Sequence, residues 1–237
     1  MTFAAAYSEL RSFLSNYCLE DLFRNRDVDL ILRRSFKKLY SILILERSFS
    51  RSQLFPEQPK SETFKLYFKE TLSDILQALM IAIQGYYKPA LLSLRSSLEN
   101  FVRCIGIFEN QAVLSLTSVY ELMDVVKETR FIKNDNQATI SFRQIKAEYA
   151  TLCGYVHTSS AAHMALDTIV GNFPRISTAD AHNFFGKLSN FSTHIVKFIV
   201  LMFPGIFNSL HHSQYDIVCD SMPPAFKRHI NIDRTRG

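Results

Sequence analysis

The sequence predicts an all-α protein, a single helical bundle of about seven helices. Only 7 Gly and 7 Pro occur in 237 residues, which leaves room for long helices and argues against a sandwich or barrel full of tight turns. Apolar residues recur at helical spacing along most of the chain, and alternating strand-like segments are nearly absent. With 47% hydrophobic residues, 20 of them Phe, the chain can bury a sizeable core.

Helices are expected where this periodicity runs between breakers. Pro56 and Pro59 mark a connector after the second helix, and Ser61 opens the third. Gly85 provides a C-terminal stop, and Pro89 lies near the first turn of the fourth helix, where a missing N–H is tolerated. The third and fourth helices should therefore form an antiparallel hairpin. The seven expected helices are 2–18, 27–50, 61–84, 85–107, 112–131, 138–157 and 177–203.

The last helix is expected to begin at Ser177, with Asp180 three positions later as a weak capping box, and to end at Pro204-Gly205. Between the sixth and last helices, 158–175 is expected to hold a short helix and a loop. Residues 1–220 are expected to form one domain, which begins with the basic N-terminal helices of 1–51. The Pro-containing segment 221–237 is expected to be a loosely held basic tail.

The net charge of +5 is concentrated at the two ends of the chain. Residues 1–51 hold 9 Lys and Arg against 6 Asp and Glu, and residues 224–237 hold 4 against 1. This distribution is compatible with a nucleic-acid partner, and equally with ordinary solvated surface charge.

Cysteine usage and hydropathy indicate a reducing compartment. The cysteines are far apart and form no CxxC pair, so reduced thiols in the cytoplasm are the simplest interpretation. The first ten residues lack the features of a signal peptide. The longest apolar stretch, 195–207, is interrupted by Lys197 and falls short of the roughly 20 residues that span a bilayer. A soluble cytoplasmic protein without a membrane partner is therefore expected. The four cysteines are Cys18, Cys104, Cys153 and Cys219.

The best candidate site is a charged stripe on the fourth helix. Arg95, Glu99 and Arg103 recur at i, i+4 and i+8, so they align, and the central carboxylate can hold both cations. One interpretation is an exposed stripe whose pairs add about 0.3–0.5 kcal/mol each. The other is a charge-compensated ladder in a groove or dimer seam, where an Arg fork grips a phosphate or carboxylate.

Two further groups complete the candidate site. His157 lies near the C-terminus of the sixth helix, where it is either a structural cap or a general acid/base or phosphate contact. On the second helix, Arg33, Arg34, Lys37 and Lys38 share one face and are candidate RNA contacts. No metal site and no cofactor are predicted, because the chain has no HExxH pair, Gly-rich phosphate loop or GxSxG elbow.

Three short motifs resemble a known family. They are Gly-Tyr-Tyr at 85–87, Leu-Arg-Ser-Ser-Leu-Glu-Asn at 94–100, and Tyr-Val-His at 155–157. In this order they resemble bacterial helical proteins similar to the HEPN superfamily (higher eukaryote and prokaryote nucleotide-binding domains), over an HEPN-like core at 61–160. The resemblance implies a helical bundle, often a homodimer, associated with abortive infection and other anti-phage systems.

In active HEPN members an Arg-x4-6-His motif cleaves RNA without a metal at the dimer cleft. His157 matches the motif His, but positions 150–152 hold Ala, Thr and Leu in place of the Arg. Arg95 or Arg103 would have to supply the charge from the neighbouring helix. The expected function is an HEPN-like protein-binding subunit of a bacterial defence or toxin–antitoxin assembly, with other defence proteins as partners. The alternative is a metal-independent ribonuclease or nucleotide-binding effector, with RNA or a nucleotide as ligand and a composite site in a homo-oligomer. In that site Arg95 and Arg103 would bind phosphate, Glu99 would orient the reacting groups, and His157 would act as acid or base.

Overall fold

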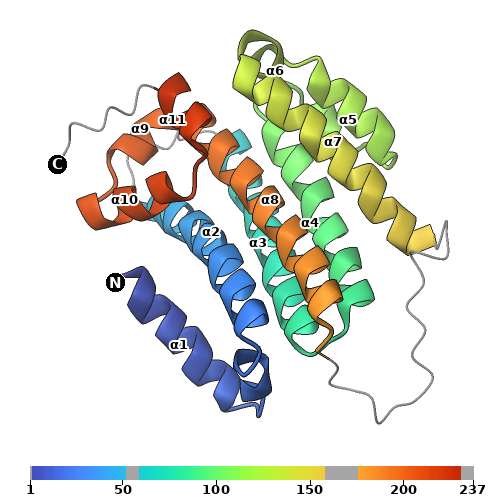
Figure 1. Ribbon diagram of the computed structural model, residues 1–237. Helices are drawn as coiled ribbons and strands as arrows, with labels where there is room; N and C mark the ends of the chain where they lie inside the picture. Colours follow the sequence, from blue (N-terminus) through green and yellow to red (C-terminus); the bar gives the residue numbers. More distant parts are fainter. Residues whose placement is uncertain (1, 52–58, 158–175, 231–237) are drawn as a thin grey trace.

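A computed structural model describes residues 2–51, 59–157 and 176–230, and these ranges are all-helical, without strands (Figure 1). They form eleven α-helices rather than about seven, because several expected helices are divided and short ones are added. The helices are α1 (Phe3–Ser15), α2 (Arg26–Arg51), α3 (Pro59–Ile83), α4 (Tyr87–Gly106), α5 (Val119–Lys127), α6 (Arg130–Asn134), α7 (Asn136–His157), α8 (Thr178–Met202), α9 (Pro204–Asn208), α10 (His212–Asp220) and α11 (Pro224–His229). Two 3₁₀ turns, η1 (Glu20–Phe23) and η2 (Gln111–Leu114), lie between them.

The predicted antiparallel hairpin is formed by α3 and α4, which pack along their lengths (Figure 1). Gly85 ends α3 with φ 84°, a conformation that residues with a side chain rarely adopt. The Tyr86 N–H donates to the Ile81 carbonyl at 3.1 Å and the Gly85 N–H to the Ala82 carbonyl at 2.9 Å, which satisfies the last carbonyls of the helix. The predicted stop at Gly85 is therefore confirmed.

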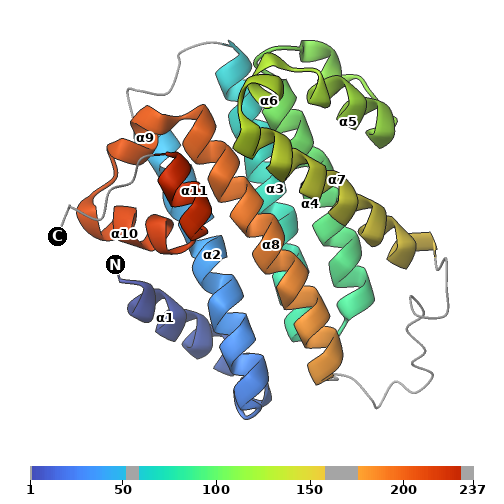
Figure 2. The ribbon, with the colours of Figure 1, turned by 45° about the horizontal axis from the view of Figure 1, so that its top comes forward.

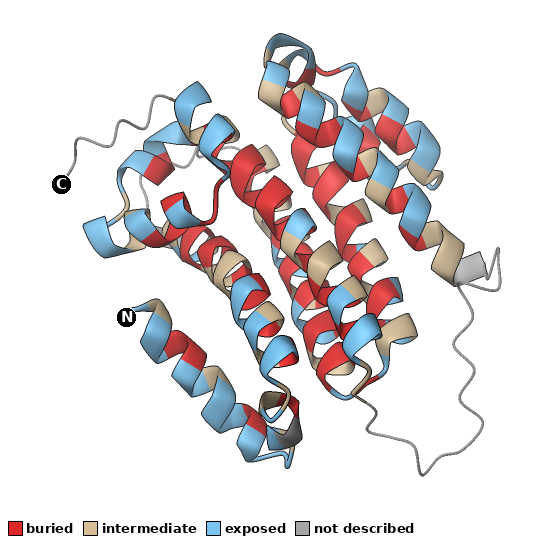
Figure 3. Ribbon diagram, viewed as in Figure 1, coloured by how far each residue is buried: buried red, intermediate tan, exposed pale blue. Residues whose placement is uncertain are grey.

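Aromatic side chains join the four long helices α2, α3, α4 and α8 into one core. Phe64 and Phe68 of α3 stack with their centroids 5.6 Å apart, and Phe49 of α2 meets both of them. Phe101 of α4 lies 5.9 Å from Phe198 of α8. All five rings are buried, and Figure 3 shows buried residues along the inward faces of these helices.

The prediction of a single helix at 112–131 is wrong, because local caps divide this segment into η2, α5 and α6. The Ser118 hydroxyl accepts from the Glu121 N–H at the start of α5. The Glu109 carboxylate accepts from the N–H groups of Arg130 and Phe131, at 2.7 and 2.8 Å, and so caps the first turn of α6. These caps compete with one continuous helix.

α8 begins and ends where the sequence indicates. The Ser177 hydroxyl accepts from the Asp180 N–H at 3.3 Å, and α8 ends at Met202, just before Pro204 opens α9. In the part of the chain that the structure describes, no helix combines the length and the apolar character needed to cross a membrane. The helix and loop expected at 158–175 lie outside the described residues.

The structure differs from the expected loose tail over residues 221–230. Pro224 opens α11 instead of preventing a helix, since a proline in the first turn sacrifices no helical hydrogen bond. Met222 and Phe226, four residues apart, are both buried, and α11 lies beside α8, where the Lys197 ammonium is 5.3 Å from the centroid of the Phe226 ring (Figure 2). This segment is therefore part of the domain, while 231–237 lie outside the described residues.

We predict that Phe226→Ala lowers the free energy of unfolding by about 3–5 kcal/mol, because it removes a ring that is 1% exposed. The measurement is urea denaturation followed by circular dichroism. Arg228→Ala, on the exposed side of the same helix, is the control and should change the free energy by less than about 0.5 kcal/mol. Equal, small effects of the two changes would mean that α11 does not contribute to the core.

Candidate functional site: polar groups between the helices

The Arg95–Glu99 part of the predicted stripe lies where α4 packs against α7. Arg95 Nη2 lies 3.1 Å from Glu99 Oε1 and donates to the Tyr149 hydroxyl at 2.9 Å. That hydroxyl donates in turn to Glu99 Oε1 at 3.2 Å. The three side chains thus form a closed triangle of interactions between the two helices.

The triangle is neither fully exposed nor fully buried. The Arg95 and Glu99 side chains are 25% and 24% exposed, whereas Tyr149 is buried. Burial acts to lower the pKa of Arg95, but the hydrogen bond to Tyr149 and the charge of Glu99 outweigh it and raise that pKa. Burial raises the pKa of Tyr149 more than the hydrogen bond from Arg95 lowers it. Tyr149 is therefore a neutral hydrogen-bond donor, and the charges of Arg95 and Glu99 are compensated.

Arg103 departs from the predicted stripe. Its Nη2 donates to the backbone carbonyl of Leu116 at 2.9 Å, and its Nη1 to the backbone carbonyl of Glu99 at 3.4 Å. The expectation that the Glu99 carboxylate holds both cations is therefore wrong for Arg103. The chain is non-helical at 116–118, so the Leu116 carbonyl has no helical partner and accepts from the guanidinium instead. Arg103 thereby ties this segment to α4.

The other predicted site residues are not brought to this triangle. His157 is the last residue of α7, and its side chain lies outside the described residues, so its catalytic role stays a prediction. On α2, Lys37 pairs with Asp220 of α10 at 2.9 Å, while Arg33 and Arg34 are exposed. Lys38 is partly buried, which lowers its pKa. The four basic residues of α2 therefore have three different environments, because α10 packs on part of the face that they share.

A second polar cluster lies between α7 and α8 and was not identified from the sequence. Asn183 donates to the Tyr155 hydroxyl at 3.0 Å, and the Lys187 ammonium lies 5.8 Å from the centroid of the Tyr155 ring. One oxygen of Glu148 is buried without a hydrogen-bond partner, and burial raises the pKa of this carboxyl more than Asn190 and Lys187 lower it. The recurrence of Asn183, Lys187 and Asn190 at i, i+4 and i+7 is the signal that could have indicated this face.

Two basic side chains of α8 are also buried, which the sequence analysis did not predict. His194 is 7% and Lys197 is 6% exposed, and His194 Nδ1 is buried without a hydrogen-bond partner. Burial, followed by the charges of Lys197 and Lys38, lowers the pKa of His194 to about 4. The sequence signal for these buried side chains is Lys197, a charged residue within the apolar stretch 195–207.

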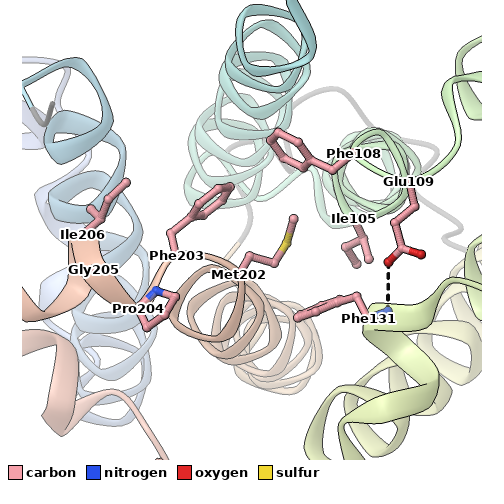
Figure 4. Close-up of a pocket in the computed structure, with 9 residues that line it drawn as sticks. All are labelled: Ile105, Phe108, Glu109, Phe131, Met202, Phe203, Pro204, Gly205 and Ile206. Carbon is pink, nitrogen blue, oxygen red and sulfur yellow. Dashed lines mark hydrogen bonds between the residues drawn. The ribbon is translucent and has the colours of Figure 1, made fainter. Parts of the chain in front are cut away.

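An apolar pocket of about 370 Å³ lies where α4 and α6 meet the α8–α9 corner (Figure 4). Among the described residues that line it, Glu109 alone is charged, and its carboxylate caps α6, as the contact to Phe131 in Figure 4 shows. The other described residues of the lining are apolar or glycine and offer no side chain for acid or base catalysis. The lining residues are Ile105, Phe108, Glu109, Phe131, Met202, Phe203, Pro204, Gly205 and Ile206.

Comparison with known proteins finds no family model, no curated protein and no solved structure that matches this chain. The HEPN resemblance therefore stays a prediction, as do the defence setting and the RNA ligand. Within the described ranges, no three His, Cys, Asp or Glu side chains come together in a way that could hold a metal ion. What the structure adds is that Arg95, Glu99 and Arg103 form their bonds with other groups of the same chain.

We predict that Tyr149→Phe lowers the free energy of unfolding by about 1.5–3 kcal/mol, since the lost hydroxyl bonds two charged side chains at a buried position. Tyr120→Phe is the matched control. Its ring lies 5.9 Å from Tyr149 but is 55% exposed, so its loss of a hydroxyl should cost less than about 0.5 kcal/mol. Guanidinium denaturation measures both variants. A Tyr149→Phe protein as stable as wild type would show that the triangle does not stabilise α4 against α7.

We also predict that stability falls as the pH is lowered from 6.5 to 4. The pKa of His194 is about 4 in the folded chain, against 6.5 for an ordinary His. In that window the unfolded chain binds a proton that the folded chain lacks, so acid favours unfolding, by an amount on the order of 3 kcal/mol.

The measurement is the free energy of unfolding across this pH window. His194→Gln should remove most of the pH dependence that His194 contributes, because the amide does not titrate. His182→Gln, at an exposed position of the same helix, should leave the wild-type profile unchanged. Parallel profiles for wild type and His194→Gln would contradict the assignment.

Proposed function

We propose that this chain is an HEPN-like helical subunit of a bacterial anti-phage defence or toxin–antitoxin system. It acts in the cytoplasm, mainly by binding other proteins of that system. The family part of this proposal is supported by the three short motifs in 61–160 and by the all-helical fold.

The observation that carries the binding role is that the polar side chains of α4 form hydrogen bonds and an ion pair within the chain itself. Arg95 and Glu99 bond each other and Tyr149, and Arg103 bonds the Leu116 carbonyl. Groups that hold α4, α7 and the segment after η2 together are structural, since moving them to meet a substrate would break these contacts. A subunit that acts by its surface is consistent with that use.

The exposed aromatic pair at the C-terminal end of α1 supports this binding role. Phe13 and Tyr17 are 45% and 62% exposed, and their ring centroids lie 5.0 Å apart. α1 lies at the edge of the bundle and packs mainly on α2 and η1 (Figure 1). Paired aromatic rings on an exposed helix end are typical anchors of protein interfaces, because they bury a large area at low entropic cost.

The second candidate is a metal-independent ribonuclease or nucleotide-binding effector, with a composite site in a homodimer. The observation that favours it is the pair Arg33 and Arg34, which is exposed on α2 and available for phosphate contacts. In this function His157 would act as acid or base, with Arg95 as the cationic partner.

We predict that co-expression with the products of neighbouring genes yields a stable complex, and that Phe13→Ser combined with Tyr17→Ser weakens it at least about tenfold. The control is Leu66→Ser, since Leu66 is a 66%-exposed apolar residue of α3. Affinity is measured by biolayer interferometry with the purified partner. Equal affinities for wild type and the aromatic variant would show that this end of α1 is not part of the interface.

A parallel assay separates the two functions. The purified chain is incubated with labelled single-stranded RNA in EDTA, beside His157→Ala and Arg95→Met. The proposal expects intact RNA in every sample. Cleavage by wild type that is lost in both variants would contradict the binding role and support the ribonuclease function.

A further inference from the structure

The apolar pocket at the α8–α9 corner has a buried floor and partly exposed walls (Figure 4). Ile105 and Ile206 form the floor and are 2% and 1% exposed. Phe108, Phe131 and Met202 form the walls, and each of them is only partly buried. Two aromatic rings and a thioether of one pocket therefore keep apolar surface in contact with water, which a ligand of matching chemistry would cover.

The walls are held in place from behind, so the pocket exists before a ligand binds. The Phe108 ring packs on Phe64 of α3 with the centroids 5.4 Å apart, and the Phe108 carbonyl accepts from the Lys60 ammonium at 2.8 Å. The Phe131 ring lies 6.0 Å from the ring of Phe198 on α8. Walls that are already fixed by packing cost a ligand little further ordering.

Glu109 places one charged group at the rim of this apolar surface. Its two carboxylate oxygens accept from the N–H groups of Arg130 and Phe131, which fixes the direction of the carboxylate. Each oxygen retains a further acceptor position. No described Lys or Arg side chain forms an ion pair with Glu109, and Lys133 of α6 pairs with Glu128 instead. The rim therefore offers a carboxylate to a cationic group of a ligand.

We propose that this pocket binds a small organic molecule in which a flat aromatic body carries a cationic amine. The body would lie among Phe108, Phe131 and Met202, since aromatic rings and thioethers favour aromatic neighbours. The amine would stay at the rim and donate a charge-assisted hydrogen bond to the Glu109 carboxylate. The same carboxylate would repel an anionic ligand.

The size of the pocket restricts the ligand to a small molecule. Its volume of about 370 Å³ lies toward the lower end of the range for small-molecule sites, about 300–1,000 Å³. A bound helix needs a longer groove, which accepts side chains from successive turns. None of the described lining residues belongs to α1 or to the Arg95–Glu99–Tyr149 triangle, so this site is independent of the proposed function.

The test is isothermal titration calorimetry of the full chain with biphenylmethylamine and with biphenylcarboxylate, two probes that share an aromatic body and differ in charge. We expect wild type to bind the amine at least about tenfold more tightly than the acid. Glu109→Gln should reduce this preference to less than about threefold, because the amide carries no charge. Glu121→Gln, at an exposed position of α5 outside the described lining, is the matched control and should keep the wild-type preference.

A second variant tests the aromatic part of the site. Phe131→Leu removes a ring but retains apolar volume, so both probes should bind at least about threefold more weakly while the preference for the amine persists. Unchanged affinities in this variant would contradict the placement of the aromatic body.

Three results would overturn the proposal. They are the absence of binding of either probe to wild type, an affinity for the acid that equals or exceeds that for the amine, and a wild-type preference that persists in Glu109→Gln. If Glu109→Gln does not fold, the preference of wild type is measured against ionic strength. It should decrease as salt is added, and a constant preference would also contradict the role of the carboxylate.

Discussion

The aromatic packing between α3, α4 and α8 is the interaction on which the rest of the structure depends. Phe101 contacts Phe68 of α3 on one side and Phe191 and Phe198 of α8 on the other, and all four rings are buried. This packing holds α4 in the centre of the bundle, where it can pair with α3 and carry α7. The apolar contacts therefore determine which polar side chains of α4 face α7 and which face solvent.

Polar groups within this frame serve two different ends. The Arg95–Glu99–Tyr149 triangle balances its charges, and Arg103 anchors a non-helical segment by its carbonyl. Such satisfied contacts fix the register of packed helices. His194 and Lys197 of α8 are buried by the same packing, and neither forms an ion pair with a described carboxylate. Burial disfavours the charged forms of His194 and Lys197 and lowers the pKa of each group.

The short C-terminal helices link these two aspects of the molecule. α10 brings Asp220 to Lys37, and α11 brings Phe226 to Lys197, so both helices contribute to the environment of the basic residues of α2 and α8. The C-terminal segment therefore contributes to the electrostatic environment of these basic residues as well as to the core.

The sequence by itself determined the helical class, the α3–α4 hairpin and the ends of α8, because periodicity, Gly85 and Ser177 act within a few residues. It also placed Arg95 beside Glu99 through their i, i+4 spacing. Only the tertiary structure decided that Tyr149 completes this pair, that Arg103 turns to a carbonyl, and that Lys197 is buried under Phe226. Those outcomes depend on which helices pack together, and contacts between residues far apart in the chain leave no local pattern.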